Sequence, residues 1–222
     1  MKKLILCIAF LSFLSCKDAL EERDEGLRFY FESPQPANDP ELSVFPNKFR
    51  GTYRNADSTF ISIGDKMMVS EHDYGFRIHK KDLDSLRDIF EFVNGKLIDK
   101  ETNKPIESHF VGDSLQISNK HIDTLFFFSA TNKIKKSNGN LILNKKEGAF
   151  WKIKILHLEK DALKIKYLYS LEDVRRIDSA SRFKARKLDS VSYLFKPERK
   201  EFKSMLKIKG LGAENEFKKT SR

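Results

Sequence analysis

Residues 151–155 read Trp-Lys-Ile-Lys-Ile, and residues 163–169 read Leu-Lys-Ile-Lys-Tyr-Leu-Tyr. In both segments every second residue is apolar, and lysine fills most of the positions between them. Successive side chains of a β-strand point to opposite faces of a sheet, so a period of two is typical of a strand with one buried face. The two segments therefore predict strands whose apolar faces build one side of a core.

Short turn sequences separate further strand-like segments on either side of this pair. Asn94-Gly95 lies between two apolar segments, and Asn138-Gly139 lies between two more. Asn-Gly favours the type I′ turn that closes a two-residue hairpin. We therefore expect a mostly β fold, an antiparallel meander of about eight to ten strands that forms a barrel or a strongly bent sheet.

Two or three short helices are expected at the edge of this sheet. Residues 82–90 place apolar side chains on one helical face. Ser170 followed by Asp173 is a capping box, which starts a second helix. Pro197 suits the first turn of a last helix, which we expect to end near Gly210.

The first fifteen residues have the pattern of a secretory signal peptide. Lys2 and Lys3 supply positive charge, residues 4–14 are mostly apolar, and the small residue Ser15 precedes Cys16. A helix that crosses a bilayer needs roughly 20 apolar residues, so residues 4–14 are too few for a permanent span. We therefore expect residues 1–15 to be removed during secretion.

Leu14-Ser15-Cys16 resembles the lipobox of bacterial lipoproteins. The resemblance implies that the thiol of Cys16 receives a lipid, that the chain is cut before it, and that the protein is anchored to a membrane. Lys17 and the acidic run that ends at Glu25 resemble the export signals of Bacteroidota-type lipoproteins, a family that offers no activity to carry over. They imply an outer-membrane location, with surface exposure as an alternative. Other readings are an ordinary signal peptide cut elsewhere and a solvated acidic tether.

The remaining chain is expected to form one domain. Residues 16–46 carry the lipidated Cys and several prolines, which favour an extended tether. Residues 47–210 are expected to form a single, mainly β domain that ends in a helix, and residues 211–222 a polar tail. Because Cys7 leaves with the signal and Cys16 carries lipid, the mature chain has no thiol for a disulfide, a zinc site or a nucleophile.

Charge is distributed unevenly along the chain. Residues 17–129 contain 15 Lys and Arg against 21 Asp and Glu, whereas residues 130–222 contain 25 against 11. A basic half suits an anionic membrane surface or an acidic polymer, and nucleic acid is a poor partner for an exported protein. Within this half, four lysines are expected to share one outer helical face: Lys196, Lys200, Lys203 and Lys207. This face is either a solvated face of a helix packed against the sheet or a contact surface for an anionic membrane or polymer.

No sequence motif indicates catalysis. The chain contains neither a Gly-x-Ser-x-Gly elbow nor a phosphate-binding glycine loop, and its five histidines show no metal-ligand spacing. Glu71 and Asp73 alternate with His72 on a strand, so the three are not expected to converge on one metal. His157 follows the period of the apolar residues before it and is expected to be a core histidine. We therefore expect no enzyme activity, no cofactor and no metal.

Two functions remain open from the sequence. The first is a lipid-anchored envelope module, without enzyme activity, that binds an envelope protein or an acidic polymer. The second is a carrier of an apolar small molecule inside a β-barrel, since Phe49-Arg50-Gly51-Thr52-Tyr53 resembles the opening strand of the lipocalins. A cavity in the barrel centre would favour the carrier, and a filled core would favour the binding module.

Overall fold

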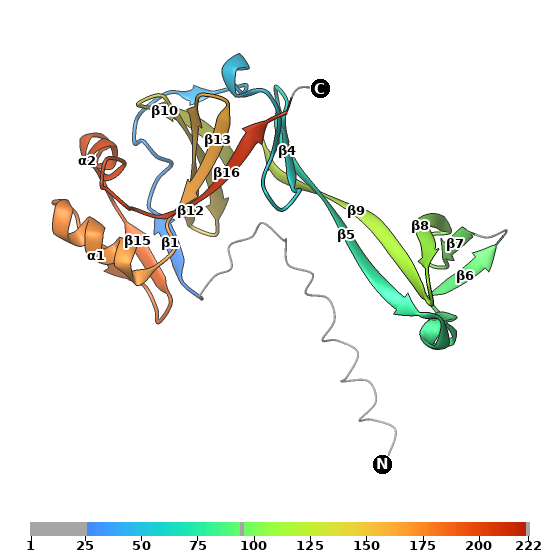
Figure 1. Cartoon of the computed structure of the whole chain (residues 1–222). Helices are drawn as coiled ribbons and strands as arrows, with labels where there is room; N and C mark the ends of the chain where they lie inside the picture. Colours follow the sequence, from blue (N-terminus) through green and yellow to red (C-terminus); the bar gives the residue numbers. More distant parts are fainter. Residues whose placement is uncertain (1–25, 94–95, 221–222) are drawn as a thin grey trace, which may run out of the picture. The chain divides into compact units, whose positions relative to one another are not determined.

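The computed structural model describes residues 26–93 and 96–220, and its fold is mostly β (Figure 1). The strands are β1 (Arg28–Phe31), β2 (Glu41–Leu42), β3 (Gly51–Arg54), β4 (Phe60–Ile63), β5 (Met67–His79), β6 (Phe90–Val93), β7 (Lys96–Asp99), β8 (Lys104–Val111), β9 (Ser114–Phe127), β10 (Asn132–Ser137), β11 (Asn140–Glu147), β12 (Phe150–Glu159), β13 (Ala162–Tyr167), β14 (Arg186–Lys187), β15 (Ser192–Phe195) and β16 (Ala213–Lys219). The helices are α1 (Leu171–Ala180), α2 (Arg199–Met205) and the 3-10 helices η2 (Asn47–Phe49) and η3 (Lys80–Leu86).

The sixteen strands belong to one open sheet. Hydrogen bonds order thirteen of them as β14-β15-β1-β12-β13-β16-β3-β4-β5-β9-β8-β7-β6, while β11, β10 and β2 branch from β12 in succession. The order ends at β14 on one side and at β6 on the other, and these two strands do not pair with each other. The mostly β, antiparallel prediction is therefore confirmed. The barrel or strongly bent sheet is wrong, because alternation of side chains predicts strands but does not specify closure.

The described chain divides into two compact units rather than the single domain that we expected for residues 47–210. Unit 1 contains residues 26–42, 129–157 and 165–214, and unit 2 contains residues 43–128, 158–164 and 215–220. Each unit is assembled from segments that lie far apart in the sequence. The chain passes between the units five times, after residues 42, 128, 157, 164 and 214, so no single linker in the sequence marks the division.

Unit 1 is built around a large apolar core. Thirteen buried residues contribute to it, eleven from β1, β11, β12, β15 and both α-helices, together with Leu168 before α1 and Leu211 after α2. Phe31, Ile177 and Phe202 have no exposed surface, and the rings of Phe31 and Phe202 meet edge to face with centroids 5.9 Å apart. A fully buried side chain of this size contributes about 1.5–3 kcal/mol to folding, so this core supplies most of the stability of unit 1.

The segment that we expected to be an extended tether is part of unit 1 from Arg28 onwards. Strand β1 runs parallel to β15, with Arg28 opposite Ser192. Further along, the N–H of Gln35 donates to Oδ1 of Asn144 at 2.6 Å, and the Asn144 amide donates back to the Gln35 carbonyl at 2.9 Å. The buried Lys135 amino group donates to the carbonyls of Pro34 and Pro36. Polar side chains of the sheet therefore bind backbone groups of residues 34–36, which the proline-rich composition predicted to be exposed to solvent.

The expected polar tail is also structured as far as Thr220. Strand β16 pairs with β3, with Lys218 opposite Arg54. Leu211 and Phe217 are 3 % and 1 % exposed, so the segment carries apolar residues into the interior despite its charged neighbours. Phe217 is the single apolar residue between Glu214 and Lys219, so period-two alternation does not identify this strand from the sequence.

The helix predictions are confirmed in position and corrected in extent. The capping box at the start of α1 is present, with the Ser170 N–H donating to the Asp173 carboxylate at 3.0 Å. Helix α2 is only seven residues long and begins after Glu198, with Phe202 and Met205 buried as expected. The segment expected as a helix over residues 82–90 is instead the 3-10 helix η3.

Both predicted Asn-Gly hairpins have the register of a two-residue turn. Ser137 pairs with Asn140, and the intervening Asn138 and Gly139 have φ angles of 49° and 83°, as a type I′ turn requires. Val93 pairs with Lys96 in the same way, although residues 94–95 lie outside the described residues.

Candidate binding surface at the tip of an arm

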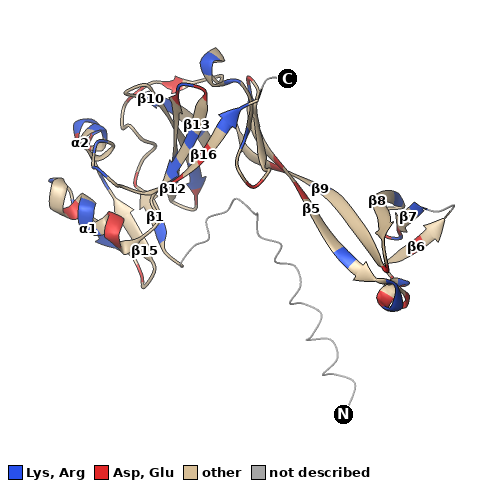
Figure 2. Ribbon diagram, in the orientation of Figure 1, with Lys and Arg blue, Asp and Glu red and all other residues tan. Residues whose placement is uncertain are grey.

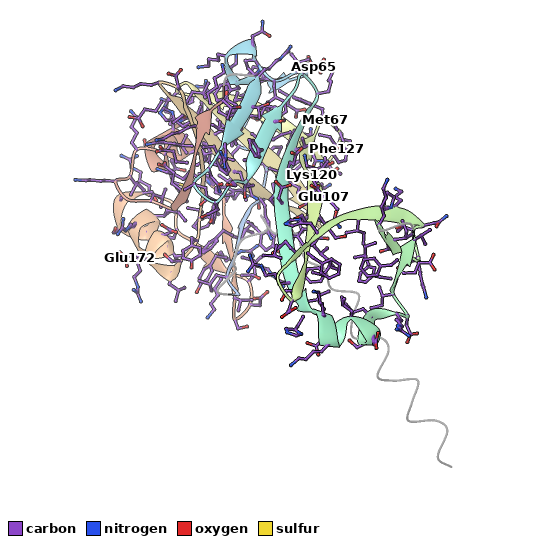
Figure 3. The ribbon with its side chains drawn as sticks, turned by 45° about the vertical axis from the view of Figure 1, so that its right-hand side comes forward. Asp65, Met67, Glu107, Lys120, Phe127 and Glu172 are labelled. Carbon is purple, nitrogen blue, oxygen red and sulfur yellow. The ribbon has the colours of Figure 1, made fainter. Side chains whose placement is uncertain are left out.

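Two long strands form an arm within unit 2. Strands β5 and β9 pair from Met67 opposite Phe127 to His79 opposite Ser114, with one shift of register between Met68 and Val69 (Figures 1 and 3). At about 3.3 Å per residue, thirteen residues of strand extend roughly 40 Å. Gly75 allows a close approach midway, because a Cβ there would lie 2.7 Å from the carbonyl oxygen of Ile117.

Residues 80–113, which we call the tip, connect the far ends of the two arm strands. They contain η3, β6, β7 and β8, and Figure 3 shows their side chains reaching into the space that these elements enclose. The buried centre is small and consists of Leu97 from the tip with Leu115 and Ile117 from β9. Few apolar contacts support the tip, so its backbone is held mainly by the hairpin hydrogen bonds.

A pocket of about 470 Å³ lies between η3, β6 and the arm strands. Ligand pockets in proteins commonly measure about 300–1,000 Å³ and are mostly apolar with a few polar groups. This pocket follows that pattern, because eight of its thirteen lining residues are apolar and the other five are charged. The apolar lining residues are Ile78, Leu83, Leu86, Phe90, Phe92, Leu97, Leu115 and Ile117.

Large apolar side chains are exposed beside this pocket. Phe92 and Phe110 are 48 % and 51 % exposed, and their rings stack with centroids 6.4 Å apart. The Lys80 amino group lies 5.3 Å from the centre of the Phe110 ring. Ile89, Val93 and Val111 are also exposed. Clustered apolar exposure of this kind marks interaction sites more often than scattered single residues do.

The outer edge of β6 has no partner strand among the described residues. The Lys100 N–H donates to the Ile89 carbonyl, and bonded and non-bonded pairs alternate along an antiparallel ladder. Glu91 and Val93 therefore direct their backbone groups to β7, whereas Phe90 and Phe92 direct theirs to the open edge. The edge presents hydrogen-bonding groups that another extended strand can satisfy.

The charged groups around the pocket form exposed pairs. Arg87 contacts Asp84 at 2.8 Å, and Lys80 contacts Asp113 at 3.4 Å. Exposed ion pairs of this kind contribute at most about 1 kcal/mol to stability, so these side chains can change conformation when a ligand binds. At the β7–β8 turn, the backbone N–H of Thr102 donates to Asp99 and lowers the pKa of that carboxyl group below its usual value.

One of the histidines, His157, does not lie where the sequence predicted. His157 is exposed and its Nδ1 lies 2.7 Å from Oδ1 of Asn140, so the core histidine prediction is wrong. His72 and His121 face each other across the arm, with ring centroids 5.1 Å apart, and His121 contacts Asp123 at 2.7 Å. Within residues 26–93 and 96–220, no three His, Cys, Asp or Glu side chains lie close enough to hold a metal ion.

The four lysines expected on one helical face are only partly grouped. Lys200 and Lys203 lie on α2, while Lys196 precedes it and Lys207 follows it. Lys196 pairs with Glu32 at 2.7 Å, and Lys203 lies 3.6 Å from Asp39. Two of the four charges are therefore paired with carboxylates, because β1 and the segment after it pack where the sequence reading placed solvent. Cys16, the expected lipid attachment site, lies outside the described residues.

The tip was missed as a site because its residues read as ordinary hairpin strands. Phe90, Phe92 and Val93 lie within four consecutive residues, and Phe110-Val111 directly precedes a turn. Apolar residues at adjacent positions point to opposite faces of a strand, and two apolar faces on a short hairpin leave at least one uncovered. That pattern is the signal available in the sequence.

Among the described residues, no helix combines the length and the apolar character that a bilayer crossing requires. No protein-family model, curated protein or solved structure matches this chain.

Proposed function

We propose that this protein is a lipid-anchored binding module of the cell envelope, without enzyme activity, and that the tip of its arm binds an envelope protein. The observation that carries the proposal is the open edge of β6, where the stacked, half-exposed rings of Phe92 and Phe110 adjoin a pocket of about 470 Å³. An extended segment of a partner satisfies such an edge by adding a strand, and its side chains take the adjacent pocket.

The contrast between the two ends of the sheet supports this reading. Natural edge strands are guarded against pairing by lysines, prolines, bulges or very short length. Strand β14 is two residues long and consists of Arg186 and Lys187. Strand β6 reads Phe-Glu-Phe-Val, with one charge and no proline. The unguarded end is the one that a partner strand can use.

The envelope location rests on the first 25 residues. A signal peptide, a lipobox at Cys16 and a Lys-acidic run support secretion and anchoring to the outer membrane. Cys16→Ser should leave the precursor uncleaved and unlabelled by a palmitate analogue. Processing of this variant at the same place would contradict the anchor while leaving the tip proposal to its own test.

The tip is tested with a photo-crosslinking amino acid at position 110, carried in the full chain in its native cells. We expect a discrete adduct with one envelope protein. Phe92→Lys should abolish the adduct, because a lysine on edge strand β6 opposes the addition of a partner strand. Leu171→Lys is the matched control, since Leu171 is 43 % exposed on α1 and the charge change is the same. Equal adduct yields in the two variants would contradict the proposal.

Both lysine variants should fold. Substitution of residues that are about half exposed changes unfolding free energy by roughly 0.5 kcal/mol or less. Circular dichroism and thermal unfolding of the two purified variants check this, so a lost adduct is attributable to the edge and not to misfolding.

A further inference from the structure

The strongest concentration of unpaired positive charge lies in the segment that leads into β14. Residues 182–187 read Arg-Phe-Lys-Ala-Arg-Lys, with no acidic residue among them. Arg182, Lys184, Arg186 and Lys187, which we call the basic edge, are all exposed, whereas Phe183 and Ala185 are partly buried against the unit 1 core. The Phe183 ring meets the Phe195 ring edge to face at 6.4 Å, which fixes this segment to unit 1.

The cations of the basic edge are available for a ligand. Within the described part of the chain, Arg182, Arg186 and Lys187 make no side-chain hydrogen bond, ion pair or ring contact, whereas Lys184 donates to the carbonyls of Asp178 and Ser181. The nearby carboxylates are engaged by backbone groups. Asp178 accepts from the Ala185 N–H at 2.8 Å, while Asp189 accepts from two N–H groups of the turn before β15.

The rest of unit 1 strengthens this positive field. Its described residues carry 21 Lys and Arg against 11 Asp and Glu, a net charge of +10, and basic residues recur along α1 and α2 (Figure 2). Unit 2 carries 16 against 16 in its described residues, so the excess belongs to unit 1. A summed field of this kind attracts polyanions from solution and is screened by salt.

The basic edge combines exposed cations with an open strand edge. Exposed cations alternate with partly buried residues from position 182 to position 186, and only Arg186 and Lys187 of this segment belong to strand β14. Strand β14 pairs only with β15, and the Leu188 N–H donates to the Ser192 carbonyl. Because bonded and non-bonded residues alternate along an antiparallel strand, the N–H of Lys187 points away from β15 to the open edge. It adds a hydrogen-bond donor beside the positive charges.

We propose that the basic edge binds a linear acidic polysaccharide, with Arg182, Arg186 and Lys187 contacting successive anionic groups. Four cations within six residues, in a segment without an acidic residue, complement the closely repeated anionic groups of such a polymer. The surface belongs to unit 1 and is independent of the tip, so either proposal can fail without the other.

The test compares two triple variants of the full chain in detergent, each of which removes three positive charges. Arg182→Gln/Arg186→Gln/Lys187→Gln alters the basic edge, and Lys196→Gln/Lys200→Gln/Lys207→Gln alters the same number of charges around α2. Binding to immobilised polygalacturonate and heparin is measured between 50 and 200 mM salt. For three ionic contacts, the slope of log affinity against log salt is about −2, so a fourfold rise in salt weakens binding roughly 16-fold.

We expect the wild type and the α2 variant to bind with this slope, and the basic-edge variant to lose the binding and most of its salt dependence. Equal weakening in both variants would overturn the proposal, because net charge alone would then explain adhesion. Binding to anionic vesicles in excess of neutral vesicles, without binding to either polysaccharide, would also overturn it in favour of a membrane surface.

Discussion

The core of unit 1 and the centre of the tip show two ways of stabilising a β structure. Unit 1 buries thirteen core residues between strands and two helices. The centre of the tip consists of three buried residues, Leu97 with Leu115 and Ile117 of β9, and the rings of Phe92 and Phe110 are half exposed. Apolar residues make up 11 of the 34 residues of the tip and 38 of the 96 described residues of unit 1. Unit 1 also has two α-helices that pack against its sheet and bury that apolar surface.

This difference in packing indicates which region can change conformation when a partner binds. A region with few buried contacts opens at low free-energy cost and adjusts to a ligand, whereas a well-packed core opens only with global unfolding. The tip combines low packing with an open strand edge, and unit 1 supplies a stable platform with a basic surface. The following predictions test that division.

The largest expected effect is on the unit 1 core. Phe202→Ala should reduce the unfolding free energy of unit 1 by about 3–5 kcal/mol, because the ring is fully buried against Phe31 and leaves a cavity. Denaturant unfolding measures the loss, and Phe110→Ala on the tip is the control, with an expected change below about 1 kcal/mol. Similar losses in both variants would remove the distinction between the regions.

A smaller and local effect is expected in the tip. Leu115→Ala should cost about 2–3 kcal/mol, since Leu115 is 1 % exposed in a centre of only three buried residues. Hydrogen exchange should accelerate in residues 80–113 while β11 and β12 keep their protection. Uniform acceleration across the chain would show that the tip and unit 1 unfold together.

The polar network under the N-terminal segment tests whether unit 1 depends on apolar burial alone. Asn144→Ala should cost about 1–3 kcal/mol, because it leaves the backbone N–H of the buried Gln35 without its acceptor. Asn140→Ala in the same strand is the control, since its side chain contacts only the exposed His157. Melting temperatures that fall equally would contradict a special role for Asn144.

The smallest expected effect is a change in pH dependence. A hydrogen bond from Arg199, opposed by partial burial, keeps the pKa of Asp39 below its usual 3.8. A lowered folded pKa gives stability that is present above pH 3.8 and is lost as pH falls through the folded value. Asp39→Asn should therefore flatten the decline in melting temperature below pH 4. Asp113→Asn, at the exposed ion pair of the tip, should leave that decline unchanged.

The features that the sequence predicted correctly depend on residues close together in the chain, and the features that it did not predict depend on contacts between distant segments. Period-two alternation and Asn-Gly turns are local, so they predicted the β class, the hairpins at 94–95 and 138–139, and the capping box at Ser170. Closure of the sheet, the division into units and the burial of residues 28–46 depend on contacts between distant segments. The proline-rich composition of this segment predicts exposure to solvent. In the structure, however, the side chains of Asn144 and Lys135 bind its backbone.

The candidate sites show the same limit. Counting charge predicted that the second half of the chain is basic, and the structure places that excess in unit 1. The choice of four lysines around α2 assumed a helix longer than the seven residues that form. Neither the carboxylate partner of Lys196 nor the missing partner strand of β6 is visible in a linear sequence.

The ladder between β5 and β9 has a consequence for proteolysis. Any single backbone cut within residues 80–113 leaves both cut fragments attached to arm strands that pair over thirteen residues. A protease that nicks the tip should therefore yield a protein of unchanged mass on native gels that separates into two pieces only in denaturant. A cut in the tip therefore need not separate residues 80–113 from the rest of the described chain.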